Sequence, residues 1–241
     1  MLKQLSASVL FATMVMAAEA DTTKGSLPGA VTNATPVTVA CVGDSITYGS
    51  AISNRARDSY PAKLQSMLGE GFRVVNFGVG SATLIRKGHP TVWSQLEGIR
   101  KAAPEIIVIS LGTNDTCGGR RKCWDHKDEF PGDYRDLLNE LRLLPSKPRI
   151  WICAPSPMVI ETPGLSADRV QNLEERTVKL QELITIIKTI AKECEVGFID
   201  LNTPLANHPE LFTKGDGVHP NKAGYEAIAK RVHAALVQPQ N

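Results

Sequence analysis

Five short apolar segments rich in β-branched residues alternate along this chain with longer segments of helical character. Apolar runs of this kind are typical of strands in a parallel sheet, because such strands are buried on both faces. Parallel neighbours need a crossover, usually a helix, so the alternation predicts an α/β fold with helices on both faces of a five-stranded parallel sheet. The predicted strands span residues 37–42, 72–76, 105–110, 149–153 and 196–201, and the predicted helices span 59–68, 91–102, 133–144, 167–192 and 221–236.

Length and composition suit one well-buried domain, since the chain has 241 residues, of which 42% are hydrophobic. Residues 37–241 are predicted to form it. The formal net charge is +2 and basic residues are spread along the chain, which argues against nucleic acid or an anionic membrane as a partner. The sequence has no C-x-x-C or H-E-x-x-H motif, so no metal and no other cofactor is expected.

The first twenty residues resemble a secretory signal peptide. Lys3 supplies the positive start, residues 9–18 form a short apolar run, and Ala18-Glu19-Ala20 matches an A-x-A cleavage site. Residues 21–36, rich in Thr, Gly, Pro and Asn, are predicted to be a flexible leader. The expected location is therefore secreted or periplasmic, and the alternative is an uncleaved membrane anchor.

The five cysteines all follow the predicted cleavage site, and an exported protein can form disulfides. Cys117 and Cys123 bracket a glycine-rich loop that a bridge would close, so this pair is the predicted possible disulfide. Cys41 and Cys153 lie inside predicted strands, where buried free thiols are expected.

The motifs that suggest chemistry all follow predicted strands. In parallel sheets, sites form at the carboxyl ends of the strands, so motifs at these positions are expected to share one site. They are Asp44-Ser45, Gly78 to Ser81, Asn114-Asp115, and the segment beyond the fifth strand that carries Asp216 and His219.

Ser45, His219 and Asp216 together suggest nucleophilic catalysis. A serine hydroxyl needs a base within hydrogen-bond reach, and the base needs an orienting carboxylate. Asp216 and His219 are three residues apart, so one tight loop can hold both side chains toward Ser45. The alternative is that Asp216-Gly217-Val218-His219 is only the turn before the last helix.

A tetrahedral intermediate also needs hydrogen-bond donors aimed at its oxyanion. The candidate donors are the backbone N–H of Ser45, a backbone N–H from Gly80 or Ser81, and the side-chain amide of Asn114.

Three further residues are candidates for lining a substrate pocket. Asp44 is adjacent to Ser45, and is also expected to orient the loop through side-chain hydrogen bonds. His89 and Trp124 lie in loops that follow the second and third predicted strands.

With these motifs in place, the chain resembles the SGNH or GDSL-type ester hydrolases. The blocks that carry the resemblance are Val42–Gly49, Val75–Leu84, Leu111–Asp115 and Asp216–Asn221. The resemblance implies a flavodoxin-like three-layer sandwich, with Ser45 as nucleophile and Asp216 and His219 as its partners. Related sequences often read Val-Ser-Gly or Val-Ser-Ala where this chain has Val79-Gly80-Ser81, which leaves open whether Gly80 or Ser81 donates to the oxyanion.

Within the family, residues 58–61, 76–79 and 208–212 resemble a bacterial sialate O-acetylesterase-like or acetylxylan esterase-like branch. This resemblance implies a secreted serine ester hydrolase that removes acetyl or other short acyl groups from a carbohydrate. One alternative is a lipase or thioesterase acting on longer acyl esters. The other is a noncatalytic glycan-binding protein on the same fold.

Overall fold

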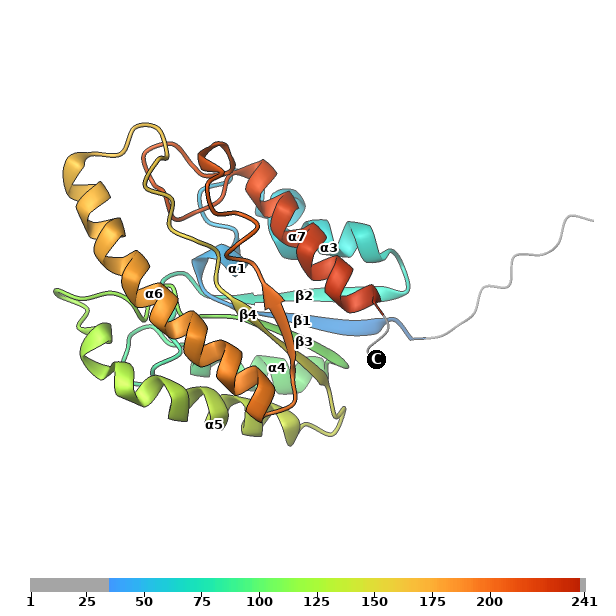
Figure 1. Ribbon diagram of the computed structural model, residues 1–241. Coiled ribbons are helices and arrows are strands. Elements are labelled where there is room, and N and C mark those ends of the chain that lie inside the picture. Colours follow the sequence, from blue (N-terminus) through green and yellow to red (C-terminus); the bar gives the residue numbers. More distant parts are fainter. Residues whose placement is uncertain (1–34, 239–241) are drawn as a thin grey trace, which may run out of the picture. The chain divides into compact units, whose positions relative to one another are not determined.

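The computed structural model describes residues 35–238 of the chain, and Figure 1 shows their arrangement. The predicted signal peptide and the predicted leader up to residue 34 lie outside the described residues. Five strands form one parallel sheet in the order β2-β1-β3-β4-β5, which confirms the predicted α/β fold. The strands are β1 (Val37–Gly43), β2 (Phe72–Gly78), β3 (Ile106–Ser110), β4 (Arg149–Ala154) and β5 (Gly197–Asp200).

The helices agree with the sequence prediction in position more closely than in their ends. A four-residue helix, α1, directly after β1 was not predicted, because one turn is too short to show helical periodicity. The predicted helix 91–102 begins as a 3₁₀ turn, η1 (Val92–Gln95). The helices are α1 (Ser45–Tyr48), α2 (Arg55–Asp58), α3 (Tyr60–Leu68), α4 (Leu96–Ala102), α5 (Phe130–Arg142), α6 (Ala167–Glu193) and α7 (Lys222–Val237), with further 3₁₀ turns η2 (Cys123–Glu129) and η3 (Pro209–Leu211).

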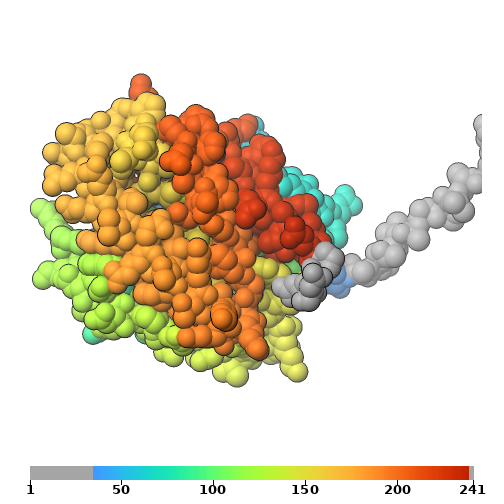
Figure 2. Space-filling view, in the orientation of Figure 1, coloured from blue at the N-terminus to red at the C-terminus, as the bar shows by residue number. Residues whose placement is uncertain are grey.

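Side chains alternate along each central strand between two helical layers, because successive residues of a strand point to opposite faces. Val39 and Cys41 pack with α3 and α7, whereas Ala40 and Val42 pack with α4, α5 and α6. Cys41 and Cys153 are fully buried free thiols, as predicted. In the view of Figure 2, atoms of α6 and α7, which belong to the two opposite helical layers, and of the segment after β5 hide most of the sheet.

Crossing a bilayer requires a long, apolar helix, and no helix among residues 35–238 meets both requirements.

The strand order reverses at β1: β2 is added on one side of β1, and β3, β4 and β5 are added in turn on the other. Gly43, the last residue of β1, pairs with Gly78 of β2 and Ser110 of β3, so the loops after these three strands leave the sheet at one level. Such a switch point is where doubly wound sheets bind ligands.

Gly78 lets β2 pass directly beneath α1. A Cβ atom at this position would stand 2.6 Å from the Thr47 carbonyl carbon and would also clash with the Tyr48 backbone nitrogen. The missing side chain is therefore what allows the contact that holds α1 against the sheet.

Replacing Gly78 with alanine should lower the free energy of unfolding by about 1–3 kcal/mol, the usual cost of overpacking. Gly71→Ala is the control, because no atom lies within 4 Å of a Cβ there. Urea unfolding of both variants checks the difference, and equal stability of the two would contradict this account of α1 packing.

Candidate active site

Ser45 is the first residue of α1 and follows β1 after one intervening residue, Asp44. Asp44 caps the helix: its Oδ1 accepts a hydrogen bond from the N–H of Ile46 at 2.9 Å. Gly49 ends the helix in a left-handed conformation, with φ of 90°. The single turn thus holds the half-buried Ser45 at the carboxyl edge of the sheet.

Asp216 organises the loop that carries His219. Its Oδ1 accepts hydrogen bonds from the N–H groups of Val218 at 2.8 Å and His219 at 2.9 Å. Gly217 has φ of 72°, which an L side chain rarely adopts. The N–H of Thr213 donates to the His219 carbonyl at 2.9 Å and closes the loop.

The structure brings Ser45, His219 and Asp216 together. Ser45 Oγ lies 2.8 Å from His219 Nε2, although the two residues are 174 positions apart. His219 Nδ1 lies 2.8 Å from Asp216 Oδ2. The His219 and Asp216 side chains are 24% and 26% exposed, so solvent and a small ligand can reach the row of hydrogen bonds.

Burial by itself would raise the pKa of Asp216. The hydrogen bond with the His219 ring and those from the His219 and Val218 N–H groups outweigh burial and lower its pKa to about 2. Arg169 on α6 donates from Nε to the Asp216 carbonyl at 3.0 Å, and its Nη2 lies 3.8 Å from Asp216 Oδ1. Asp216 is therefore an ionised, oriented partner for the imidazole at neutral pH.

The other candidate oxyanion donors lie on two loops that are joined by a hydrogen bond. Asn114 Nδ2 donates to the Ala82 carbonyl at 3.0 Å, which leaves its second amide hydrogen for another acceptor. Gly80 and Ser81 are exposed, and within residues 35–238 neither N–H has a hydrogen-bond acceptor. Ser81 has φ of 64°, a conformation that costs an L residue about 1–2 kcal/mol. Strain of this kind in a non-glycine residue is often found at functional sites.

Asp115 anchors the loop after β2, a role that the sequence analysis missed. It is fully buried, and its Oδ1 accepts from the N–H groups of Leu84 at 3.0 Å and Ile85 at 2.9 Å. Burial raises the pKa of Asp115 to about 7, against the lowering effect of these two bonds. Burial likewise raises the pKa of Asp44 to about 6, against the bond from Ile46.

Arg176 of α6 is a second residue that sequence reasoning missed. Its side chain is almost fully buried, and it donates to Thr116 Oγ1 at 3.0 Å and to the Thr113 carbonyl at 2.8 Å. Arg176 and Arg169 belong to no local motif, and only the position of α6 beside the site shows their contacts.

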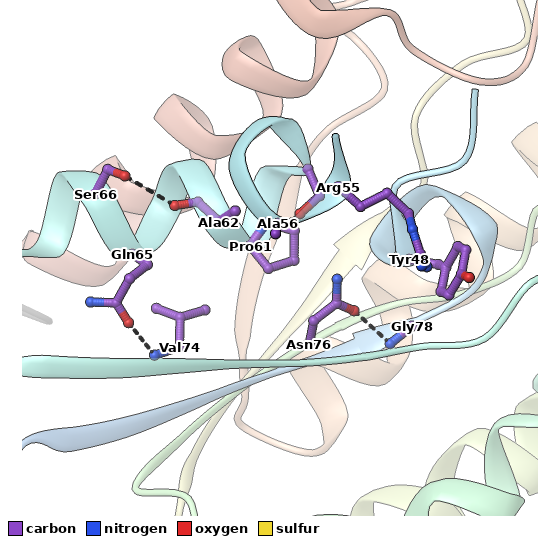
Figure 3. A pocket seen from close by; sticks show the side chains of 11 residues that line it. Tyr48, Arg55, Ala56, Pro61, Ala62, Gln65, Ser66, Val74, Asn76 and Gly78 are labelled. Atoms are coloured by element: carbon purple, nitrogen blue, oxygen red, sulfur yellow. Dashed lines mark hydrogen bonds between the residues drawn. The ribbon is translucent and has the colours of Figure 1, made fainter. Parts of the chain in front are cut away.

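A cavity of about 520 Å³ opens one helical turn from Ser45. Figure 3 shows it between α3 and the end of β2, with the Arg55 side chain against the Tyr48 ring. The Arg55 guanidinium carbon lies 3.7 Å from the centre of that ring. Ser45 does not line the cavity, but Tyr48 does. Because residues three apart on a helix are neighbours on one face, Tyr48 lies between Ser45 and the cavity.

The structure places the three predicted pocket residues elsewhere, and none of them lines this cavity. Asp44 is only 2% exposed, because its carboxylate caps α1. His89 is exposed on a loop closed by the hydrogen bond from the Thr83 N–H to the Pro90 carbonyl. Trp124 packs on the core beside α5 and α6.

The predicted disulfide is not formed, since Cys117 and Cys123 are both free thiols. The Cys123 thiol is directed to the Arg121 carbonyl at 3.5 Å, and the Arg121 guanidinium lies 4.0 Å from the Cys117 sulfur. Each thiol therefore contacts a different part of Arg121.

Comparisons with known proteins agree with this geometry. The model of the GDSL-like lipase/acylhydrolase family matches residues 41–227. An acetylxylan esterase from Xylanibacter ruminicola is 30% identical over an alignment of 222 residues, which covers 83% of this chain and 43% of that protein. A multidomain esterase from Ruminococcus flavefaciens is 28% identical over 134 residues, 55% of this chain and 15% of that protein. The chain spans less than half the length of these curated relatives.

Solved structures share the fold. A carbohydrate acetylesterase family member from Sinorhizobium meliloti superposes with a TM-score of 0.66 at 21% identity, covering 83% of this chain and 97% of that chain. The acetyl xylan esterase AlAXEase superposes with a TM-score of 0.63 at 19% identity, covering 83% and 100% of the two chains.

The raised pKa of Asp115 predicts a pH-dependent stability. The ordinary pKa of an aspartate is 3.8, so at a pH between 3.8 and about 7 Asp115 holds a proton in the folded protein but not in the unfolded chain. The contribution of this proton to the free energy of unfolding is therefore complete below pH 4 and is lost as the pH rises through 7. In Asp115→Asn, the fall in the free energy of unfolding between pH 4 and pH 8 should be smaller by about 1–3 kcal/mol.

Denaturant unfolding at a series of pH values measures this fall. An asparagine Oδ1 can accept both backbone bonds, so the variant keeps the loop anchored. Asp125→Asn changes an exposed aspartate and serves as the control. An unaltered pH dependence in Asp115→Asn would rule out the buried proton.

Proposed function

Because the chain belongs to the GDSL-like lipase/acylhydrolase family, we propose that it is a serine ester hydrolase that removes acetyl or other short acyl groups from a carbohydrate. The family membership confirms the resemblance predicted from the motifs. The observation that carries the proposed activity is the continuous row of hydrogen bonds from Ser45 through His219 to Asp216, with 2.8 Å at each step. It lies at the carboxyl edge of a parallel sheet, where such folds hold their sites.

In the proposed reaction, Ser45 Oγ attacks the acyl carbon while its proton moves to His219 Nε2. The tetrahedral intermediate then collapses: the bond from the acyl carbon to the sugar oxygen breaks, and His219 returns the proton to that oxygen. His219 then takes a proton from a water molecule, which attacks the acyl carbon. The bond from the acyl carbon to Ser45 Oγ breaks, His219 returns the proton to Ser45 Oγ, and the carboxylic acid is released. Asp216 holds the imidazole with its proton on Nδ1 and stabilises the cation that forms.

The proposed oxyanion donors are the Ser45 N–H, the N–H of Gly80 or Ser81, and the free amide hydrogen of Asn114. The Ser45 N–H belongs to the first turn of α1, where N–H groups have no acceptor within the helix. Loss of one such donor typically costs about 2.7–4 kcal/mol of barrier.

The cavity beside Tyr48 suits the alcohol part of a carbohydrate ester. Its amide side chains are already engaged: Gln65 accepts from the Val74 N–H at 2.7 Å, and Asn76 accepts from the Gly78 N–H at 2.8 Å. The Tyr48 ring and the Arg55 guanidinium are therefore available to contact a ligand. The names of the relatives, an acetylxylan esterase and a carbohydrate acetylesterase, support an acetylated sugar as the substrate class.

Ser45→Ala should lower kcat for p-nitrophenyl acetate by at least about a thousandfold, because it removes the nucleophile. It should also abolish labelling by a serine-reactive phosphonate. Ser94→Ala, which changes an exposed serine, is the control. A Ser45→Ala variant that keeps more than about a tenth of the wild-type rate would contradict the proposed hydrolase and favour the noncatalytic glycan-binding protein.

Tyr48→Ala tests the cavity. The variant should lower kcat/KM for an acetylated xylo-oligosaccharide about two- to tenfold more than kcat/KM for p-nitrophenyl acetate, since stacking on an aromatic ring is worth about 0.5–1.5 kcal/mol. Leu143→Ala removes another exposed apolar side chain, 80% exposed, and is the matched control. Equal loss on both substrates would place the sugar somewhere other than this cavity.

A further inference from the structure

Arg121 joins the two loops that carry candidate oxyanion donors. Its Nη2 donates to the Ser81 carbonyl at 2.6 Å, and its Nη1 donates to Asn114 Oδ1 at 3.1 Å. Asn114 Nδ2 in turn donates to the carbonyl of Ala82, the residue after Ser81. These bonds close a ring that includes residues from the loops after β2 and β3.

The ring fixes how the Asn114 amide is turned. A guanidinium can only donate, so the atom that faces Arg121 is the amide oxygen, and the NH₂ group points to the other side. One of its hydrogens binds the Ala82 carbonyl and the other is left for a ligand. A hydrogen bond to the carbonyl oxygen also polarises the amide and makes its N–H groups better donors.

Arg121 also restrains Ser81. With φ of 64°, Ser81 is in a conformation that an L residue leaves readily unless its surroundings hold it. Within the described residues, the charge-assisted bond from Arg121 to the Ser81 carbonyl is the side-chain contact that holds this backbone in place.

The charge on Arg121 is not neutralised locally, since no carboxylate among residues 35–238 forms an ion pair with it. Its neighbour Arg176 is also a cation, and the proximity of Arg121 helps to lower the pKa of Arg176, although burial is the larger cause. A guanidinium beside the donors favours negative charge developing on a bound ester.

We propose that Arg121 is a positioning residue for ester hydrolysis, which sets the orientation of the Asn114 amide and the Ser81 backbone at the oxyanion site. This inference rests on the proposed function. Arg121 acts through its neighbours and not on the reacting atoms, so its removal affects the transition state more than the bound substrate.

The first test compares kcat and KM for p-nitrophenyl acetate. Arg121→Ala should lower kcat about ten- to hundredfold, because small misplacements of reacting groups cost this much, and KM should change less than about threefold. Arg121→Lys should recover part of the loss, since an ammonium reaches one carbonyl but does not offer the fork of two donors. Arg120→Ala removes an exposed arginine of the same loop and should stay within about twofold of the wild-type kcat.

A double-mutant cycle tests whether Arg121 acts through Asn114. In an Asn114→Ala background, Arg121→Ala should lower kcat by less than about threefold, because the amide that it orients is gone. Full additivity of the two losses, or a loss confined to KM, would overturn the proposal. So would an Arg121→Ala variant whose kcat stays within twofold of the wild type.

The side-chain amide NMR signals of Asn114 separate this inference from the proposed function. They should shift in Arg121→Ala and not in Arg120→Ala, whether or not the protein hydrolyses esters. Shifted signals in a protein whose ester hydrolysis does not depend on Ser45 would refute the proposed function and leave the contact intact. Unshifted signals would refute the contact, and with it the positioning role.

Discussion

The hydrogen bond between Ser45 Oγ and His219 Nε2 is the contact on which the proposed chemistry depends, and the sheet makes it possible. Its two residues are separated by most of the domain. They meet because β1 and the segment beyond β5 end at one edge of a sheet whose strands all run in the same direction. Parallel strands place every following loop on that edge, so residues distant in sequence need only short local structures to reach each other.

Those local structures are held by buried polar groups. A buried carboxylate or guanidinium costs free energy unless hydrogen bonds satisfy it. Asp44 caps α1, Asp115 binds the loop after β2, and Arg176 binds the loop after β3. Each group fixes one loop of the site, and burial perturbs its pKa. The buried residues that hold the loops of the site in place therefore also make the stability of the protein depend on pH.

Much of the fold and part of the site could be predicted from the sequence, for identifiable reasons. The strands were recognisable because β-branched runs and glycine ends are local signals, whereas α1 was too short to show a period. Asp216 and His219 were recognisable because their spacing suits one tight loop. Trp124 and His89 were predicted to line a substrate pocket, and neither lines the cavity beside Tyr48, because following a strand does not decide where a loop turns. The predicted bridge between Cys117 and Cys123 was wrong, since both are free thiols that contact different parts of Arg121.

The sequence by itself determined the α/β alternation, the family and the residues able to act as nucleophile, base and carboxylate. These features depend on residue type and on spacing along the chain, which are both visible in one dimension. Only the tertiary structure decided that Arg169, Arg176 and Arg121 brace the site and that a cavity opens beside Tyr48. Contacts of this kind depend on how helices and loops pack around the sheet, and long-range packing leaves no local pattern in the sequence.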